Sequence, residues 1–262
     1  MKERADKLLV RRGLAPTWEK AQALIMAGLV FSGPAKVPKP GSLLDEDAGL
    51  ALKDTLPFVS RGGLKLAEAL DRFAVDVREK TAVDVGASTG GFTDCLLQRG
   101  ARKVYAVDVD TTQLDWKLRN DPRVVLIEKN ARYLVPGEIP EPPDLVTVDV
   151  SFISLLKVLP ALAAVPGGWL LLALVKPQFE AGRREVGKKG IVRDPAVHAD
   201  VLDRVVRGAR ETGFTLRGLI RCSTRGQKGN VEFFGCWDRS GRDPGRASEE
   251  TWIKEATSHE IH

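Results

Sequence analysis

The feature that most constrains this chain is a glycine-bearing loop that lies between an apolar run and an amphipathic segment, at residues 83–94. Residues 81–85 predict a buried strand, and residues 92–97 predict a helix that starts directly after the loop. A strand–loop–helix of this kind gathers free backbone N–H groups and the positive end of a helix dipole at one point. It therefore predicts an α/β fold with a nucleotide-like ligand at the start of that helix.

The spacing of the glycines distinguishes between possible ligands. Gly86, Gly90 and Gly91 do not form G-x-G-x-x-G, so a dinucleotide fits this loop poorly. An acid two residues before the first glycine, Asp84, suits S-adenosylmethionine better, because that cofactor carries a sulfonium, an amino acid and a ribose but no phosphate. The alternative is a glycine turn without a ligand in an ordinary α/β domain.

A second acid supports a nucleoside ligand. Residues 104–108 form another apolar run that ends in Asp108, 22 residues after Gly86. An acid at the tip of the second strand hydrogen-bonds ribose hydroxyls in nucleotide-binding βαβ units. Asp108 is the candidate for this contact, and Asp110 is the alternative.

The rest of the chain from residue 81 alternates between strand and helix patterns. This alternation predicts a Rossmann-like, mostly parallel seven-stranded sheet with helices on both faces. The helix at 195–212 has the clearest ends, because Asp194 can cap it, Pro195 starts it and Gly213 follows it. The expected strands are 81–85, 103–108, 123–128, 144–150, 169–175, 214–222 and 230–237, and the expected helices are 91–99, 111–119, 152–164 and 195–212.

The first part of the chain differs in composition from the rest. Residues 1–56 predict a small α+β unit, and residues 1–40 hold eight Lys and Arg against three acids, an excess of five. This bias indicates a module that binds nucleic acid, although a solvated helix face is an equal alternative on charge alone. Residues 57–63 are expected to be a linker, residues 64–238 the main domain and residues 239–262 a flexible tail.

Composition excludes several classes of protein. The three cysteines lack metal-ligand spacing, and two of the three histidines lie in the last four residues, so no metal site is expected. The first residues are charged, which is not typical of a secretory signal. The most apolar stretch, 158–175, is interrupted by prolines and glycines and does not predict a membrane span. We therefore expect a cytoplasmic protein.

Polar residues at the ends of predicted strands suggest a reactive site. Asp149 and Lys176 each follow an apolar strand, at the edge of the sheet where ligands bind in such folds. Each residue alone also has a purely structural explanation: Asp149 can cap a turn, and Lys176 can be a cation at a strand end. Glu232 lies inside an apolar strand, where a buried carboxylate needs a partner such as a lysine.

Seven segments of the chain, in order, resemble the TlyA (hemolysin A-like) family of ribosomal RNA 2′-O-methyltransferases, from about residue 3 to residue 237. They are FVSRGGLKL (58–66), DVGASTGGFT (84–93), QLDWKLR (113–119), NAR (130–132), DVSFISL (149–155), KPQFE (176–180) and KGNVEFF (228–234). The resemblance implies an N-terminal RNA-binding module like that of small-subunit ribosomal protein four and a catalytic domain like that of FtsJ.

The resemblance also implies roles for individual residues. A Lys-Asp-Lys-Glu tetrad of the family maps onto Lys65, Asp149, Lys176 and Glu232, and Lys65 is added to the site by resemblance alone. The expected cofactor is S-adenosyl-L-methionine, and the expected partner is ribosomal RNA or a ribosomal subunit. The residues assigned to the cofactor are Asp84, Gly86, Ser88, Thr89, Gly90, Gly91, Phe92, Asp108, Asn130 and Asp149. The residues assigned to RNA are Arg4, Lys7, Arg11, Arg12, Lys20, Arg61, Arg183, Arg184, Lys188 and Lys189.

Two aromatic residues have open roles at this point. Trp18 replaces an expected phosphate-binding cation, since Thr17-Trp18-Glu19 stands where the family's RNA module usually has a Ser-Arg-like pair. It is expected to pack against the neighbouring domain, or else to stack on a base. Phe152 is expected either to stack on adenine or the target base, or to pack in the core.

The expected reaction is in-line transfer of a methyl group from a sulfonium to a ribose 2′-oxygen, with Lys176 as base or hydroxyl-orienting group. One alternative is a non-catalytic RNA-binding or ribosome-assembly factor, which the intact glycine loop and Lys176 disfavour. Another is a membrane-active hemolysin, which the lack of an expected spanning segment disfavours. The sequence leaves the oligomeric state open, and a monomer is compatible with it.

Overall fold

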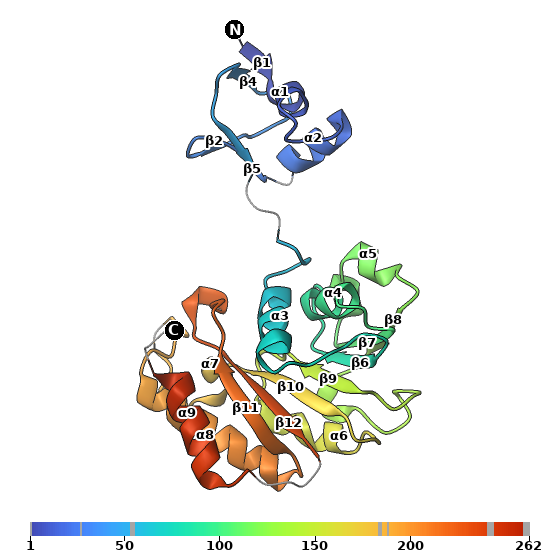
Figure 1. Ribbon diagram of the computed structural model, residues 1–262, viewed down its shortest axis with the longest axis vertical. Helices are drawn as coiled ribbons and strands as arrows, with labels where there is room; N and C mark the ends of the chain where they lie inside the picture. Colours follow the sequence, from blue (N-terminus) through green and yellow to red (C-terminus); the bar gives the residue numbers. More distant parts are fainter. Residues whose placement is uncertain are drawn as a thin grey trace. The chain divides into compact units, whose positions relative to one another are not determined.

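The computed structural model describes residues 2–26, 28–52, 56–182, 185–187, 189–239 and 244–258. The chain divides into two compact units, Met1–Pro57 and Phe58–His262, and each has its own hydrophobic core. Figure 1 shows both units coloured along the sequence.

The N-terminal unit is a small α+β fold. Strand β2 pairs with both β3 and β5, and β1 pairs with β4 in a separate ladder. Helices α1 and α2 cover a core that contains Leu9, Ile25 and Val30. The elements are β1 (Lys2–Arg4), α1 (Ala5–Arg11), α2 (Trp18–Met26), β2 (Val30–Ser32), β3 (Ala35–Lys36), β4 (Leu43–Asp45) and β5 (Leu50–Leu52).

The second unit is built around a seven-stranded sheet in the order β11-β12-β10-β9-β6-β7-β8, which confirms the predicted Rossmann-like fold. Strand β12 pairs antiparallel with both of its neighbours, while β6 to β10 run parallel. The strands are β6 (Thr81–Val85), β7 (Lys103–Asp108), β8 (Val124–Glu128), β9 (Leu145–Val148), β10 (Leu170–Val175), β11 (Thr215–Arg221) and β12 (Phe233–Asp238). The helices are α3 (Gly62–Arg72), α4 (Gly91–Gln98), α5 (Trp116–Arg119), α6 (Leu159–Ala163), α7 (Pro177–Glu180), α8 (Pro195–Glu211) and α9 (Arg246–Thr257).

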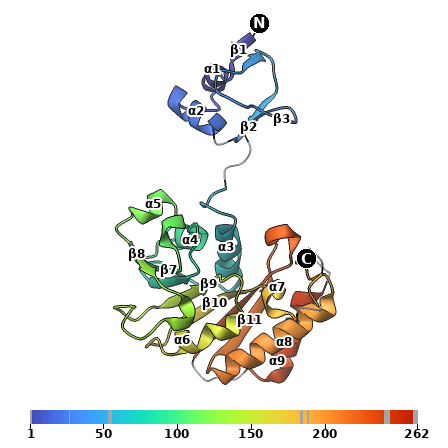
Figure 2. The same cartoon turned by 180° about the vertical axis from the view of Figure 1, so that it is seen from behind.

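Helices cover both faces of this sheet, as Figures 1 and 2 show from opposite sides. Successive side chains of a strand point to opposite faces. Val83 therefore joins one core with α6, α8 and α9, while Ala82 joins the other core with α3 and α4. Since β6 lies between β9 and β7, its carboxyl end opens at the centre of the sheet edge where a ligand is expected.

Two predicted helices are shorter and more broken than their sequence patterns suggested. The segment 111–119 is a 3₁₀ turn followed by α5, because Asp110 and Asp115 each accept a backbone N–H and start separate turns. The segment 152–164 begins with three non-helical residues, a 3₁₀ turn capped by Ser154, and α6, whose start is set by Pro160. Helix α8 starts at Pro195 with the predicted Asp194 cap.

The expected flexible tail is wrong for the part of it that forms α9. This helix packs on α8 and β11, and its Ile253 and Ala256 side chains are 7% and 5% exposed. Its buried Glu249 accepts a hydrogen bond from Arg210 of α8 at 2.7 Å. Three anchors spaced along twelve residues are enough to dock a helix, although they leave its sequence polar on average.

Candidate active site

Two hollows meet at the carboxyl ends of β6, β7, β9 and β10. The larger measures about 970 Å³ and includes Asp108 and Asn130. The smaller measures about 320 Å³ and includes Lys65 and Lys176. Asp149 lines both, as do Gly86, Ser88, Ser151, Phe152, Gln178 and Phe179. The two hollows are therefore compartments of one cleft, with the loop after β9 between them.

Close packing explains why the loop after β6 carries glycines. Gly86 has a φ of 85°, and a Cβ atom there would lie 2.7 Å from the backbone oxygen of Asp149. Gly90 has a φ of 95°, and a Cβ there would meet the side chain of Leu118. Gly86 lines the cleft directly, whereas Gly90 acts through packing. Thr89, Gly91 and Phe92 line the smaller hollow.

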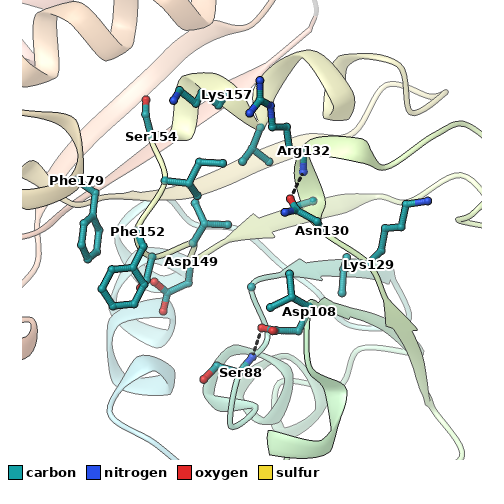
Figure 3. A pocket seen from close by; sticks show the side chains of 18 of the residues that line it. Ser88, Asp108, Lys129, Asn130, Arg132, Asp149, Phe152, Ser154, Lys157 and Phe179 are labelled. Carbon is teal, nitrogen blue, oxygen red and sulfur yellow. Dashed lines mark hydrogen bonds between the residues drawn. The ribbon is translucent and has the colours of Figure 1, made fainter.

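Asp108 lies where a ribose-binding acid is expected. It ends β7, lines the larger hollow and accepts a hydrogen bond from the backbone N–H of Ser88 at 2.8 Å. Figure 3 shows this contact across the glycine loop. The alternative, Asp110, caps the following turn by accepting from the backbone N–H of Thr112 at 3.0 Å and does not line the cleft. The geometry therefore favours Asp108.

Asp84 does not line the cleft, although it was assigned to the cofactor. Its carboxylate is fully buried beneath the loop and accepts hydrogen bonds from Thr93 at 2.7 Å and from Thr147 at 3.1 Å. Burial raises the pKa of Asp84 to about 7, against the opposing effect of the two threonine hydrogen bonds. Asp84 thus ties β6, α4 and β9 together below the site and has no direct path to a ligand.

Asn130 lines the larger hollow on the far side of β7. Its side-chain oxygen accepts from the backbone N–H of Arg132 at 3.0 Å, which fixes the amide at the start of a 3₁₀ turn (Figure 3). Lys129, Arg132 and Lys157 line the same hollow. No local pattern marks these three cations as site residues: Lys129 directly follows β8, and Arg132 and Lys157 lie within short 3₁₀ turns.

The four tetrad residues form two lysine–carboxylate pairs. The Nζ atom of Lys176 lies 2.5 Å from Oδ1 of Asp149. Lys65, on α3, is paired with Glu232, just before β12. Lys65 is 8% exposed and Glu232 only 2% exposed, so neither charge is well solvated and each needs the other. Lys65 is therefore the lysine partner that the sequence predicted for Glu232.

Two neighbours complete this cluster. Ser151 accepts a hydrogen bond from Lys176 at 2.8 Å, and the Gln178 amide donates to Oε1 of Glu232 at 3.1 Å. The cluster therefore holds two positive and two negative groups in fixed positions. Segments that are far apart in the chain supply them: α3, the loop after β9, the end of β10 with α7, and the segment before β12.

Glu180 is a residue whose role the sequence did not reveal. Its carboxylate accepts from the Ser154 hydroxyl and from the backbone N–H of Leu155, both at 2.6 Å. Burial raises its pKa, against the opposing effect of these hydrogen bonds. Glu180 joins α7, which carries Gln178, to the loop that carries Asp149, so it fixes one side of the cluster relative to the other.

Phe152 stands at the mouth of the cleft and not in the core. Its side chain is 89% exposed, and its φ of 65° is rare for a bulky residue. Its ring lies 5.1 Å from the ring of Phe179, centroid to centroid. Figure 3 shows the two rings together, opposite Ser88 and Asp108. An exposed aromatic residue in a strained conformation is typical of functional sites.

The cations assigned to RNA differ in their surroundings. Arg4 is paired with Asp6 at 2.7 Å and Arg11 with Glu3 at 3.0 Å, while Arg12 donates to the backbone oxygen of Ala48 at 2.5 Å. Lys7, Lys20 and Lys189 are exposed, and Arg61 lines the smaller hollow. Arg183, Arg184 and Lys188 lie outside the described residues.

Within the described ranges, no group of three or more His, Cys, Asp or Glu side chains is arranged to hold a metal ion. The helices described there include none that is both long and apolar enough to cross a membrane. The three cysteines are buried and unbridged, and burial raises the pKa of Cys95 and Cys236 to about 12.

Comparison with known proteins identifies the domain. Residues 58–239 match the family model of FtsJ-like methyltransferases. The chain belongs to this family. The match spans the glycine loop and all four tetrad residues, so the motif-based resemblance is confirmed for the second unit.

Individual relatives cover nearly the whole chain. YqxC of Bacillus subtilis is 54% identical over 237 residues, which are 88% of this chain and 84% of the relative. TlyA of Mycobacterium tuberculosis is 45% identical over 244 residues, 92% of this chain and 91% of the relative. A solved structure from Streptococcus thermophilus is 44% identical and superposes with a TM-score of 0.74, covering 97% of this chain and 95% of the other. The family resemblance to TlyA is thereby confirmed.

Proposed function

We propose that this protein transfers a methyl group from S-adenosylmethionine to a ribose 2′-hydroxyl of ribosomal RNA. The observation that carries the proposal is the cleft in which Asp149 lines both compartments, with Asp108 on one side and two lysine–carboxylate pairs on the other. The 45% identical TlyA relative is named as a 16S/23S rRNA (cytidine-2′-O)-methyltransferase.

The larger compartment suits the cofactor. Asp108 offers a fixed carboxylate for ribose hydroxyls, Asn130 offers an amide, and the loop from Gly86 leads into the N-terminus of α4. A Cβ at Gly86 would clash with the backbone of Asp149, so the loop has no room for a larger residue at this point. These features fit an adenosine with an attached amino acid, and S-adenosylmethionine supplies the methyl group as an electrophilic sulfonium.

The smaller compartment suits the acceptor ribose. A lysine ammonium has three N–H donors. Lys176 forms an ion pair with Asp149 and donates one N–H to Ser151, which leaves further N–H groups for the ribose 2′-oxygen. Lys176 then orients the hydroxyl, or accepts its proton when neutral, as the oxygen attacks. Lys65, Glu232 and Gln178 keep the remaining charges in place. Holding both reactants in line supplies most of the acceleration in a two-substrate transfer.

The substrate is large, and several cations are placed to bind it. Arg61, Lys129, Arg132 and Lys157 line the cleft, and the N-terminal unit adds exposed Lys7 and Lys20. Phosphate contacts of this kind position RNA without reading its sequence. We therefore propose a ribosomal subunit or its RNA as the partner, with the exposed Phe152 ring available to stack on a base.

The test is transfer of a labelled methyl group from S-adenosylmethionine to ribosomal subunits and to free ribosomal RNA, followed by nucleoside analysis. The proposal predicts 2′-O-methylated nucleosides with at least one of these substrates. RNA binding without any transfer would support a non-catalytic assembly factor instead. Methylation of a base and not of a ribose would contradict the proposed acceptor.

A further inference from the structure

A separate hollow lies on the N-terminal unit, remote in sequence from the cleft. It measures about 370 Å³ and is lined by Lys7, Val10, Arg11 and Trp18. Lys7, Val10 and Arg11 share one face of α1 because they are spaced by three and four residues. Trp18 is the first residue of α2 and faces this stripe across the hollow.

A buried carboxylate ties together the two helices that line this hollow. Asp6 of α1 is fully buried and accepts hydrogen bonds from Arg4 at 2.7 Å and from Gln22 of α2 at 3.2 Å. These contacts hold the pKa of Asp6 well below its usual range, with Arg4 the largest cause. Trp18 begins the helix that Gln22 ties to α1, and 47% of the tryptophan is exposed. A half-exposed tryptophan at the start of a helix that is tied to its neighbour offers an apolar surface.

The charges around the hollow point to an anionic partner. Lys7 is exposed and has no ion pair among the residues that the structure describes. Arg11 is half exposed and lies near two acids, Glu3 at 3.0 Å and Glu46 at 3.9 Å. Ion pairs of an exposed arginine contribute little to stability, so Arg11 can exchange them for a phosphate. An aromatic surface between two cations is the arrangement by which proteins bind single-stranded nucleic acid.

We propose that this hollow binds a nucleobase from a loop or single-stranded segment of RNA, stacked on Trp18, with the flanking phosphates at Lys7 and Arg11. The inference rests on the proposed function in that it takes the substrate to be RNA, and it assigns to the N-terminal unit a preference for unpaired over duplex RNA. In a duplex the bases are stacked on each other and cannot reach an indole in a surface hollow.

The test uses the full-length protein and two labelled RNA probes, a single-stranded oligonucleotide and the same sequence as a duplex. Trp18→Ala is expected to weaken binding of the single strand on the order of 10-fold, the loss of one base–aromatic stack, and to change duplex binding little. Trp18→Phe is expected to retain most of the affinity, since it keeps an aromatic face. Leu43→Ala, at another exposed apolar residue of the same unit (62% exposed), is the control.

Salt dependence separates stacking from charge. Trp18→Ala is expected to leave the slope of log affinity against log salt concentration unchanged. Lys7→Ala should make this slope shallower, by the amount that corresponds to the loss of one phosphate contact. Equal loss with both probes, or wild-type binding by Trp18→Ala, would overturn the inference. If that wild-type binding came with a lowered unfolding temperature, the role of Trp18 would be to pack in the N-terminal unit. Because these readouts measure binding, they stand whether or not methyl transfer is detected.

Discussion

Lys176 has the most direct role of any residue in the proposed reaction, because it is the lysine paired with the aspartate that both compartments share. Lys176→Ala is expected to lower the single-turnover transfer rate on the order of 100-fold or more, the usual effect of removing a group that moves or orients a proton. Binding of S-adenosylmethionine, measured by calorimetry, should change only a few-fold. A folded variant with the wild-type rate would exclude the assigned role.

Glu180 is expected to act by positioning. Glu180→Gln keeps one acceptor oxygen but replaces the other with an N–H₂ group, so one of the donors from Ser154 and Leu155 loses its partner. The loop that carries Asp149 should then hold its geometry less well, and kcat should fall about 10-fold while KM for S-adenosylmethionine stays nearly constant. Ser154→Ala, which removes only one of the two contacts, should have a smaller effect. A lowered melting temperature with unchanged kcat would show that the contact serves stability alone.

The buried carboxyl of Asp84 should make the protein less stable as the pH rises. The unfolded carboxyl ionises near a pKa of about 3.9, whereas the folded one keeps its proton up to about 7. The unfolded state therefore binds fewer protons in this window, and the free energy of unfolding should fall as pH rises from about 4 to about 7, by roughly 4 kcal/mol at most. Urea unfolding at pH 5 and pH 8 should show a smaller difference in Asp84→Asn than in the wild type. Equal differences in the two proteins would contradict this account.

The sequence predicted three site residues from local patterns alone. Asp149 and Lys176 directly follow apolar strands, and Glu232 interrupts an apolar run, so each departs visibly from its surroundings. Lys65 lies on an ordinary amphipathic helix, and only its family resemblance marked it. Glu180 ends a segment that resembles the family, but the segment does not indicate its role, because that role depends on two turns that meet only in the folded protein.

At the scale of elements, the positions of the strands and of the long helix α8 follow from hydrophobic periodicity, and the short turns do not. Residues 111–119 were expected to form one helix, but two aspartates accept backbone N–H groups and divide the segment into two turns. The sequence did not predict the terminal helix α9. Its Glu249 is buried because it pairs with Arg210 of another helix, and such a contact leaves no local pattern in the sequence.

Helix α9 should contribute measurably to the stability of the second unit. Ile253→Ala removes most of a buried side chain from the core that α9 shares with α8 and β11, and it is expected to destabilise the protein by about 2–3 kcal/mol. Glu255→Ala, an exposed change on the same helix, should stay within about 0.5 kcal/mol. Urea unfolding of both variants makes the comparison, and equal stabilities would mean that α9 does not dock as described.

At the scale of the whole molecule, the second unit is expected to bind the methyl donor and carry out the transfer. The N-terminal unit is expected to add affinity for RNA. All four tetrad residues and Asp108 belong to the second unit, which has its own cores. A protein reduced to residues 58–262 is therefore expected to bind S-adenosylmethionine within a few-fold of the full chain. Its kcat/KM for ribosomal RNA should fall on the order of 10-fold or more, since it lacks the basic N-terminal unit. Undiminished kcat/KM would show that the N-terminal unit does not recruit the substrate.

The central claim is that the cleft around Asp149 and Lys176 places a methyl group on a ribose of ribosomal RNA. Mass-spectrometric mapping of ribosomal RNA tests it most directly, after treatment of subunits with S-adenosylmethionine and either the wild type or Lys176→Ala. The account predicts added ribose methylation at defined nucleotides with the wild type and little or none with the variant. Equal ribose methylation by both proteins, or methylation confined to bases, would contradict it.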